Sequence, residues 1–572
     1  MTDPNHIQTM AFRFSNLFKK PGEGQEGSGW QYGRILWDRL GQCWNIPTIL
    51  LLAALIASIW VFRCYCLEQP LDSTRFMEEW GLEVWVVLDA LIFFLVLRLG
   101  GWLRYPALIL VSFWGTVHLT SAKIYGNLLH YGQIASAMET TGSETAGYLQ
   151  FVGFFPLFAF IGLFVFFWAL TWKASRTGWF GLVMLACLSI APVAELIFSA
   201  AIGEKYSQSY EFMRFPAEKM KDRYLNTLAY RYPTMIGQYF SIRNRLMDAG
   251  NKERTLPEGV SLPAGVTGND IPRRIVIVLG ESDWRAHHGA YGYPVGTDRF
   301  MMGRRKDQAH TAFFTAIAPS AVTREAVPRV MTFATARDME PFTENMGIAD
   351  MAEHAGYQTG WFSRQNMDGI YDTLVKVVAQ QAEKTVYFNE GRDEVLVQPL
   401  VAEFKDRKQL FVMHIWGGHM WYEDRHDDID YQRASRSSKE FRHYDAAIGH
   451  IDRVLEKLTE HGDGKTLFIY VPDHGEIVNL GHGTADLKGA QFDIPFYAWS
   501  SNAAYITRFR KAVNRYSIND GRLFNTSAFP FVMAEVMGYQ VSEDARVKSL
   551  EESNYVFNVD GYAYPLSDIK WQ

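Results

Sequence analysis

The stretch Tyr470-Val-Pro-Asp-His-Gly-Glu-Ile-Val-Asn-Leu-Gly-His-Gly483 decides both the fold and the candidate chemistry of this chain. It continues an apolar run that begins at Lys465, and this pattern is typical of a buried parallel strand. Asp473 and His474 would then lie at the carboxyl end of the strand, where open α/β sheets bind ligands. A carboxylate and an imidazole both suit Zn²⁺. The Asp-His-Gly motif alone is weak evidence, so the prediction depends on other stretches that end at the same edge.

Four further runs have the composition of strands, and helical patterns separate them. They are Ile275–Leu279, Thr359–Phe362, Leu410–Ile415 and Ile494–Trp499. The connections are long enough for the crossover helices that a mainly parallel sheet requires. We therefore predict an α/β/α sandwich for a soluble domain spanning residues 256–572.

Two further residues could join Asp473 and His474 in a metal site. Glu281 follows the first strand in Gly280-Glu281-Ser282, and Thr323 stands where the loop 318–331 enters a helix. A hydroxyl at a helix N-terminus lies in positive potential, which suits anion binding and nucleophile ionisation; the alternative is a simple N-cap. Together the four residues could complete a tetrahedral Zn²⁺ site that activates Thr323 as the nucleophile for a phosphodiester.

Two histidines lie in glycine-rich loops near the same predicted edge. His419 follows a strand in the segment Gly-Gly-His419, and His482 lies between two glycines. Both are predicted partners of a phosphate or a leaving group.

The composition indicates a membrane part joined to the soluble part. The 572 residues are 48% apolar and 15% aromatic, with 17 Trp, yet 21% are charged. The net charge of −6 argues against a nucleic-acid partner. All four cysteines lie in the first third of the chain, so residues 256–572 contain no disulfide.

Five apolar runs have lengths near the ~20 residues that cross a bilayer. They are Ile46–Phe62, Val84–Leu103, Pro106–Ala122, Phe151–Trp172 and Trp179–Ile202. Buried helices of a soluble core are the alternative, but the number of runs and their bordering Trp and Tyr favour spans. We predict a cytoplasmic arm (1–44), a five-helix transmembrane domain (45–203) and interfacial helices (204–255).

Positive charge predicts the orientation. Lys and Arg crowd the N-terminal arm and the connections on its side, so the N-terminus is expected in the cytoplasm. Five spans then place residues 256–572 on the far side, in the periplasm.

The connection between the third and fourth spans carries three polar residues at helical spacing. Ser136, Thr140 and Glu144 share one face if this segment is helical. Without further context, a solvated helix face is the favoured explanation, ahead of substrate binding.

Several motifs occur in a specific order along the chain. They are Gly280-Glu-Ser, Arg285, Tyr291-Gly-Tyr293, Thr323 with Pro328, Gly-Gly-His419, Tyr444-Asp445, Asp473-His-Gly-Glu476 and His482-Gly. With the five spans, this series resembles the phosphoethanolamine transferases, bacterial inner-membrane enzymes of the alkaline phosphatase superfamily. The resemblance implies a zinc-bound threonine nucleophile, phosphatidylethanolamine as the donor, and lipopolysaccharide or another envelope glycan as the acceptor.

The chain departs from the resembled family at two places. The family's donor-binding helix has Asn, Thr and Glu where this chain has Ser136, Thr140 and Glu144, which the resemblance implies bind substrate. Lipid A-modifying members have disulfides in the soluble domain and a Lys in the loop that here contains Gln365 and Asn366. These two residues, expected to bind substrate, are more similar to members that modify lipopolysaccharide core or periplasmic glucans, so lipid A is the less favoured acceptor.

Other functions were weighed against this resemblance. A phosphoglycerol transferase of the lipoteichoic acid synthase type shares the layout, but a carboxylate at Glu144 favours an ammonium headgroup. A formylglycine sulfatase is excluded because the soluble part lacks cysteine, unless Ser320 were modified. An inactive transferase fold acting in envelope assembly would have no need of all four metal ligands.

Overall fold

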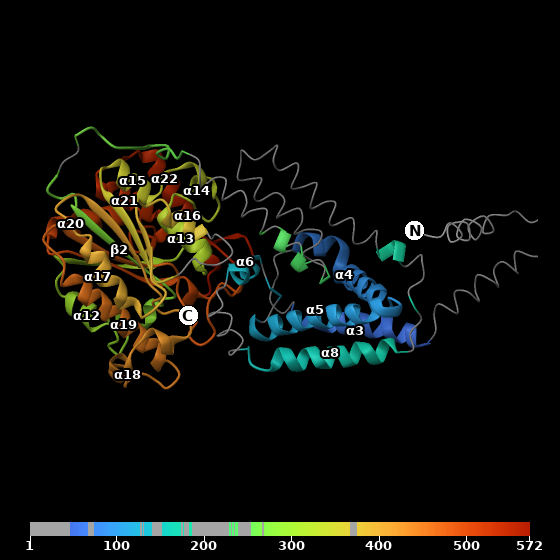
Figure 1. Ribbon diagram of the computed structural model, residues 1–572. Coiled ribbons are helices and arrows are strands. Elements are labelled where there is room, and N and C mark those ends of the chain that lie inside the picture. The colour runs from blue at the N-terminus through green and yellow to red at the C-terminus, as the bar shows by residue number, and fades with distance from the viewer. Residues whose placement is uncertain are drawn as a thin grey trace, which may run out of the picture.

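A computed structural model describes the chain in two parts, a group of apolar helices and an α/β domain (Figure 1). The described residues are 46–66, 74–125, 128–129, 131–139, 152–172, 176, 182–185, 228–239 with three gaps, 253–265, 268–365 and 374–571. Thr140, Glu144, Asn366, the side chain of Ser136 and most of the fifth predicted span lie outside this set, as does the N-terminal arm.

The α/β domain is built on one eight-stranded sheet with the order β5-β4-β6-β2-β7-β8-β3-β9. The strands are β2 (Arg274–Gly280), β3 (Thr311–Ile317), β4 (Gln358–Ser363), β5 (Thr385–Tyr387), β6 (Gln409–His414), β7 (Thr466–Pro472), β8 (Asp493–Trp499) and β9 (Phe524–Asn525). Strand β8 alone runs antiparallel to its neighbours β7 and β3, so the sheet is mixed but mainly parallel. Two small antiparallel pairs join β1 (Val260–Ser261) to β10 (Gln540–Val541), and β11 (Tyr555–Phe557) to β12 (Ala563–Pro565).

The five strands expected from the sequence are confirmed, each to within one residue at either end. Three strands of the sheet were not predicted. Strands β5 and β9 have three and two residues, too few for a periodic signal. Strand β3 pairs with β8, and its residues vary from buried to exposed without strict alternation.

Helices cover both faces of the sheet, which confirms the α/β/α sandwich (Figure 1). The helices are α12 (Arg299–Arg304), α13 (Thr323–Met331), α14 (Glu340–Glu344), α15 (Ile348–His354), α16 (Leu374–Ala379), α17 (Val397–Ala402), α18 (Asp428–Arg433), α19 (Arg442–Thr459), α20 (Ala503–Arg515), α21 (Phe529–Met537) and α22 (Glu543–Glu552). Successive residues of β2 point to opposite faces. Ile277 therefore packs in one core with Val327 of α13, and Val278 packs in the other core with Ile448 of α19.

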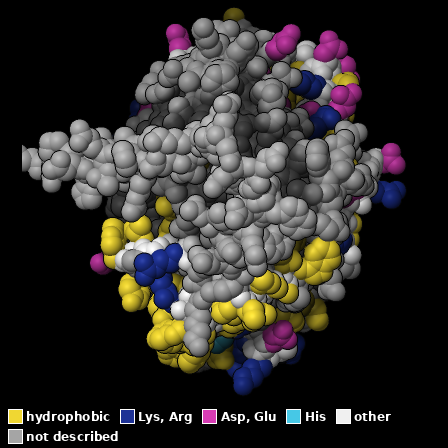
Figure 2. Space-filling model, turned by 90° about the vertical axis from the view of Figure 1, so that its right-hand side faces the viewer, with side chains coloured by type: hydrophobic (Ala, Val, Ile, Leu, Met, Phe, Trp, Pro, Cys, Tyr) yellow, Lys and Arg dark blue, Asp and Glu magenta, His cyan; other side chains and the backbone are white. Residues whose placement is uncertain are grey.

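The N-terminal helices pack around a separate apolar core. They are α3 (Ile46–Cys66), α4 (Thr74–Leu97), α5 (Arg104–Tyr125) and α8 (Phe155–Thr171), with α6 (Tyr131–Glu139) between α5 and α8 in the chain. Leu55, Ala90, Leu108 and Phe167 are buried together in this core. Among the described residues, apolar side chains gather on the lower part of the face seen in Figure 2, and Phe158 on α8 is 69% exposed.

Four of the five predicted spans overlap helices of this group, α3, α4, α5 and α8, although α4 begins ten residues before the predicted second span and ends six residues before its end. By length and composition, one helix among the described residues, Arg104–Ile124, is long and apolar enough to cross a membrane. Shorter apolar helices include Ile46–Trp60, Val86–Leu97 and Phe155–Thr171. The five-helix membrane domain and its exact bounds remain predictions.

Candidate active site

The site forms where the adjacent parallel strands β2 and β7 end together. Gly280 pairs with Pro472 in the sheet, so the residues that follow, Glu281 and Asp473, emerge side by side. The backbone N–H of Asp473 donates to the carbonyl of Gly280 at 3.0 Å and keeps the two ends in register. Helix α13 begins at Thr323, which brings a third segment to this edge.

Thr323 contacts two of its predicted partners directly. Its hydroxyl Oγ1 lies 2.8 and 3.0 Å from the two carboxylate oxygens of Glu281. It also lies 3.1 Å from Nε2 of His474. The N-cap of α13 is Val322, so Thr323 does not cap this helix and its hydroxyl faces the neighbouring side chains.

His474 and Asp473 complete the group. The other ring nitrogen of His474, Nδ1, lies 2.8 Å from the Gly475 carbonyl and therefore donates to it. Its Nε2, which contacts Thr323, also lies 3.3 Å from Glu281 Oε1 and 3.4 Å from Asp473 Oδ2. The structure thus brings together all four residues predicted to bind the metal.

These residues fit a divalent cation. Asp473 Oδ1 accepts from the backbone N–H of Ser282 and of His474, but its Oδ2 is buried with no hydrogen-bond partner. Burial and the nearby Glu281 raise the pKa of Asp473 well above its usual range. Burial also opposes ionisation of Glu281, but His474 outweighs it and holds the pKa of Glu281 well below its usual range. A cation would satisfy the free oxygen and the crowded negative charge, and two carboxylates, an imidazole and a hydroxyl suit Zn²⁺. The ligand roles themselves remain predictions.

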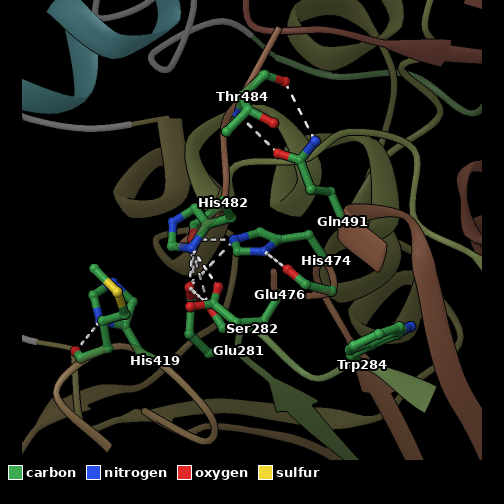
Figure 3. Close-up of polar contacts among 12 residues, drawn as sticks. Glu281, Ser282, Trp284, His419, His474, Glu476, His482, Thr484 and Gln491 are labelled. Carbon is green, nitrogen blue, oxygen red and sulfur yellow. Dashed lines mark hydrogen bonds and ion pairs between the residues drawn. The ribbon is translucent and has the colours of Figure 1, made fainter. Parts of the chain in front are cut away.

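His482 lies against this group, as Figure 3 shows. Its ring centre is 4.3 Å from that of His474. The buried carboxylate of Glu476 accepts from His482 Nδ1 at 2.9 Å, so Nε2 is free to face a substrate. The hydroxyl of Tyr422 donates to the other oxygen of Glu476 at 2.7 Å. Burial and Glu476 raise the pKa of Tyr422 well above its usual range, which keeps this hydroxyl a donor.

His419 approaches from the loop after β6. Its Nδ1 lies 2.6 Å from the carbonyl of Met420, and its ring centre is 5.5 Å from that of His482. Ligand atoms of His419, His482 and Glu281 all lie within 4.8 Å of one another. The structure therefore places both predicted histidines beside the metal group.

The structure describes only some of the other residues that were predicted to bind substrate. Gln365 Nε2 donates to Glu281 Oε2 and to the Ile415 carbonyl, both at 3.0 Å, so it lies against a candidate metal ligand. Helix α6 contains Ser136, and its Gln133 donates to the Gly483 carbonyl at 3.1 Å, next to His482. Helix α6 therefore reaches the edge of the site, while Thr140 and Glu144 lie outside the described residues and their binding role stays a prediction.

Two further side chains form hydrogen bonds to the backbone of the loops that follow β2 and β7. Tyr444 donates its hydroxyl proton to the Ser282 carbonyl at 2.9 Å and accepts from the Trp284 N–H. Gln491 accepts from the Thr484 N–H at 2.7 Å and fixes the loop that carries His482 (Figure 3).

The sequence analysis missed three residues that shape the site. Glu476 and Ser282 stand inside its motifs but received no role, and Tyr422 was not singled out. Ser282 has φ +54°, a conformation that non-glycine residues rarely adopt, and its hydroxyl lies 3.2 Å from Glu281 Oε1. A strained residue at a strand end is a signal of function that only coordinates reveal.

The chain is similar to several known proteins. A model of the sulfatase family matches residues 273–520. Phosphoethanolamine transferase EptC of Escherichia coli K12 is 25% identical over 342 residues, which cover 53% of this chain and 59% of the relative. Phosphoethanolamine transferase CptA of Salmonella typhimurium is 25% identical over 344 residues with the same coverage. The match thus spans less than two thirds of these relatives.

One comparison extends over both parts of the chain. The integral membrane protein lipooligosaccharide phosphoethanolamine transferase A of Neisseria meningitidis has the same fold with a TM-score of 0.56. The likeness covers 87% of this chain and 97% of that one at 16% sequence identity.

Proposed function

We propose that this chain transfers phosphoethanolamine from phosphatidylethanolamine to an envelope acceptor, a proposal supported by the match of residues 273–520 to the sulfatase family and by the similarity to phosphoethanolamine transferases. The single observation that carries the proposal is the contact of the half-buried Thr323 hydroxyl with the buried Glu281 and His474, beside the Asp473 oxygen that has no hydrogen-bond partner. A nucleophile beside a ready-made cation site is what transfer through a covalent phosphoenzyme requires.

Glu281, Thr323, Asp473 and His474 would hold Zn²⁺, with His419 and His482 beside them. The bound ion supplies a Lewis acid that lowers the pKa of the threonine hydroxyl and offsets the charge of the phosphoryl group.

The first half-reaction forms a phospho-threonine. Thr323 Oγ1 releases its proton to the Glu281 carboxylate, 2.8 Å away, and bonds to phosphorus as the bond from phosphorus to the diacylglycerol oxygen breaks. His482 Nε2 gives a proton to the leaving oxygen, because Glu476 holds its Nδ1. In the second half-reaction an acceptor hydroxyl loses its proton to His482 and displaces Thr323, which regains its proton from Glu281.

The membrane layout is part of the proposal. Five spans would place the N-terminus in the cytoplasm and residues 256–572 in the periplasm, with interfacial helices within 204–255. Ser136, Thr140 and Glu144 would bind the donor headgroup, and Gln365 and Asn366 would help to define the site. Lipopolysaccharide core or a periplasmic glycan is the proposed acceptor.

The test is capture of the phosphoenzyme. The full chain, in vesicles of phosphatidylethanolamine labelled in its headgroup, should carry the label on the peptide that contains Thr323, as mass spectrometry can detect. Thr323→Ala should abolish the label, whereas Thr507→Ala, an exposed threonine on α20, should retain it. Label on Thr323 from phosphatidylglycerol but not from phosphatidylethanolamine would contradict the proposed donor.

A further inference from the structure

A buried carboxylate stands in the middle of the apolar helix α4. Asp89 is fully buried, and its two oxygens accept from the backbone N–H groups of Leu228 at 2.9 Å and Ala229 at 3.2 Å. A charged side chain within an apolar helix is costly, so it needs partners and commonly marks a functional position. Its partners here come from a segment 139 residues later in the chain.

Helix α5 holds the same peptide from its other side. Trp114 Nε1 donates to the Leu228 carbonyl at 2.7 Å, and His118 Nε2 lies 3.2 Å from that carbonyl. The other nitrogen of His118 lies 3.0 Å from the Tyr232 hydroxyl, and the two rings stack with centres 4.7 Å apart. Residues of α4 and α5 thus bind both the backbone N–H donors and the backbone carbonyl of the segment 228–229.

This segment leads to one side of the candidate active site. Tyr232 packs in a small buried cluster with Ile134 of α6. The preceding residue of α6, Gln133, donates to the carbonyl of Gly483, which follows His482. Helix α6 lies between the apolar helices and the α/β domain in Figure 1.

The same segment also leads to the nucleophile. Tyr239 is fully buried, and the Arg324 guanidinium lies 5.3 Å from the centre of its ring. Arg324 directly follows Thr323 at the start of α13. Between these contacts, Arg231 donates to the Leu129 carbonyl at 3.0 Å and fixes the chain just before α6.

We propose that Asp89, Trp114 and His118 form a membrane anchor, a set of positioning residues that hold the candidate site at the level of the lipid headgroups. The inference rests on the proposed function, because only a bilayer-borne donor makes that level matter. The reacting phosphate lies at a fixed depth in the bilayer, and a displacement of about 1 Å in a reacting group can cost on the order of 10²-fold in rate. The anchor is connected to both Thr323 and His482 through neighbouring residues. It therefore positions the nucleophile and its proton donor together relative to the bilayer.

The test compares two reactions of the full chain in vesicles that contain phosphatidylethanolamine. One is headgroup transfer from the lipid, and the other is hydrolysis of bis(4-nitrophenyl) phosphate, a small soluble diester. Asp89→Leu should lower transfer by about ten-fold or more, corresponding to roughly 1.4 kcal/mol, and leave diester hydrolysis within about two-fold of wild type. Thr116→Ala is the matched control on α5 and should change neither reaction, because the buried Thr116 hydroxyl donates to the Ser112 carbonyl of its own helix at 2.8 Å.

Trp114→Phe is the second variant, for the case that Asp89→Leu does not fold. It keeps an aromatic ring and removes only the N–H donor, so it should show the same split between the reactions to a smaller extent. Asp89→Asn, which keeps one acceptor oxygen, should restore part of the transfer. Full transfer by both Asp89→Leu and Trp114→Phe, or an equal fall of both reactions in both variants, would overturn the anchor. Absence of transfer in wild type, with diester hydrolysis intact, would overturn the proposed function instead.

Discussion

At the scale of single residues, Glu476 connects the loop histidine to the core of the domain. Glu476→Gln replaces one acceptor oxygen by an NH₂ group, so the side chain can no longer accept from both Tyr422 and His482. We expect transfer to fall by about 10- to 100-fold, the usual cost of losing an outer partner of a site residue. Glu423→Gln, an exposed neighbour of Tyr422, is the matched control. Normal transfer by Glu476→Gln would show that His482 needs no fixed orientation.

The unpaired oxygen of Asp473 predicts a metal-dependent stability. A ligand that binds only the folded state raises the melting temperature. Chelation with EDTA should therefore lower the melting temperature of the wild-type chain, and added Zn²⁺ should restore it. Asp473→Ala should respond to neither treatment, whereas the exposed Asp544→Ala should respond like wild type. A wild-type melting temperature that ignores both EDTA and Zn²⁺ would contradict the metal site.

The convergence of the four candidate ligands could be predicted because parallel strands deliver their ends to one edge. That rule alone was enough to predict that Glu281 and Asp473 lie at the same edge. The contact between Tyr422 and Glu476 could not be predicted, because 54 residues separate them and loop conformation alone brings them together. The role of Asp89 was hidden for the same reason: the sequence shows a charge inside an apolar run but not its distant partner.

At the scale of elements, His450 joins helix α19 to α18 and to the 3₁₀ helix Asp393–Leu396. Its Nδ1 lies 2.8 Å from Asp430 and its Nε2 lies 2.9 Å from Glu394. Burial alone would lower the pKa of His450, but hydrogen bonds to these two carboxylates raise it to about 9. Both ring nitrogens therefore donate, and the folded state holds a proton that the unfolded chain releases near pH 6.5.

This raised pKa sets the direction of a pH effect. The stabilisation from His450 is fully present below about pH 6.5 and is lost as the pH rises through about 9. Across this window the free energy of unfolding should fall by up to about 3 kcal/mol through this group. The difference in melting temperature between wild type and His450→Gln should thus shrink as the pH rises. His310→Gln is the control, because the His310–Asp307 pair is exposed. A difference that stays constant from pH 6.5 to 9 would contradict the prediction.

Element boundaries followed from the sequence where strands were buried on both sides. All residues of β2 and β7 are buried, so their apolar runs are continuous and end sharply. The sequence does not indicate that β8 runs antiparallel to its neighbours. Its residues are also nearly all buried, and a buried run has the same composition in either direction.

At the scale of the whole molecule, the α/β domain contains two cores of its own, one on each face of the sheet. We therefore expect residues 256–572 to fold alone, to bind Zn²⁺ and to hydrolyse a soluble diester. Transfer from vesicles should be at least about ten-fold slower than for the full chain, because the membrane anchor is missing. Circular dichroism, metal content and transfer rates check these three expectations. Full vesicle transfer by the fragment would contradict the role of the apolar helices.

The candidate donor atoms lie just after β2, at the start of α13 and just after β7, and 151 positions along the chain separate Thr323 from His474. A ribosome has therefore synthesised most of the α/β domain before the set exists. A nascent chain that has reached only Thr323 offers a lone carboxylate and a hydroxyl, which bind metal ions weakly. If the proposed zinc site forms, metal capture would therefore be a late event in biogenesis, open only to chains in which β7 has already joined the sheet beside β2.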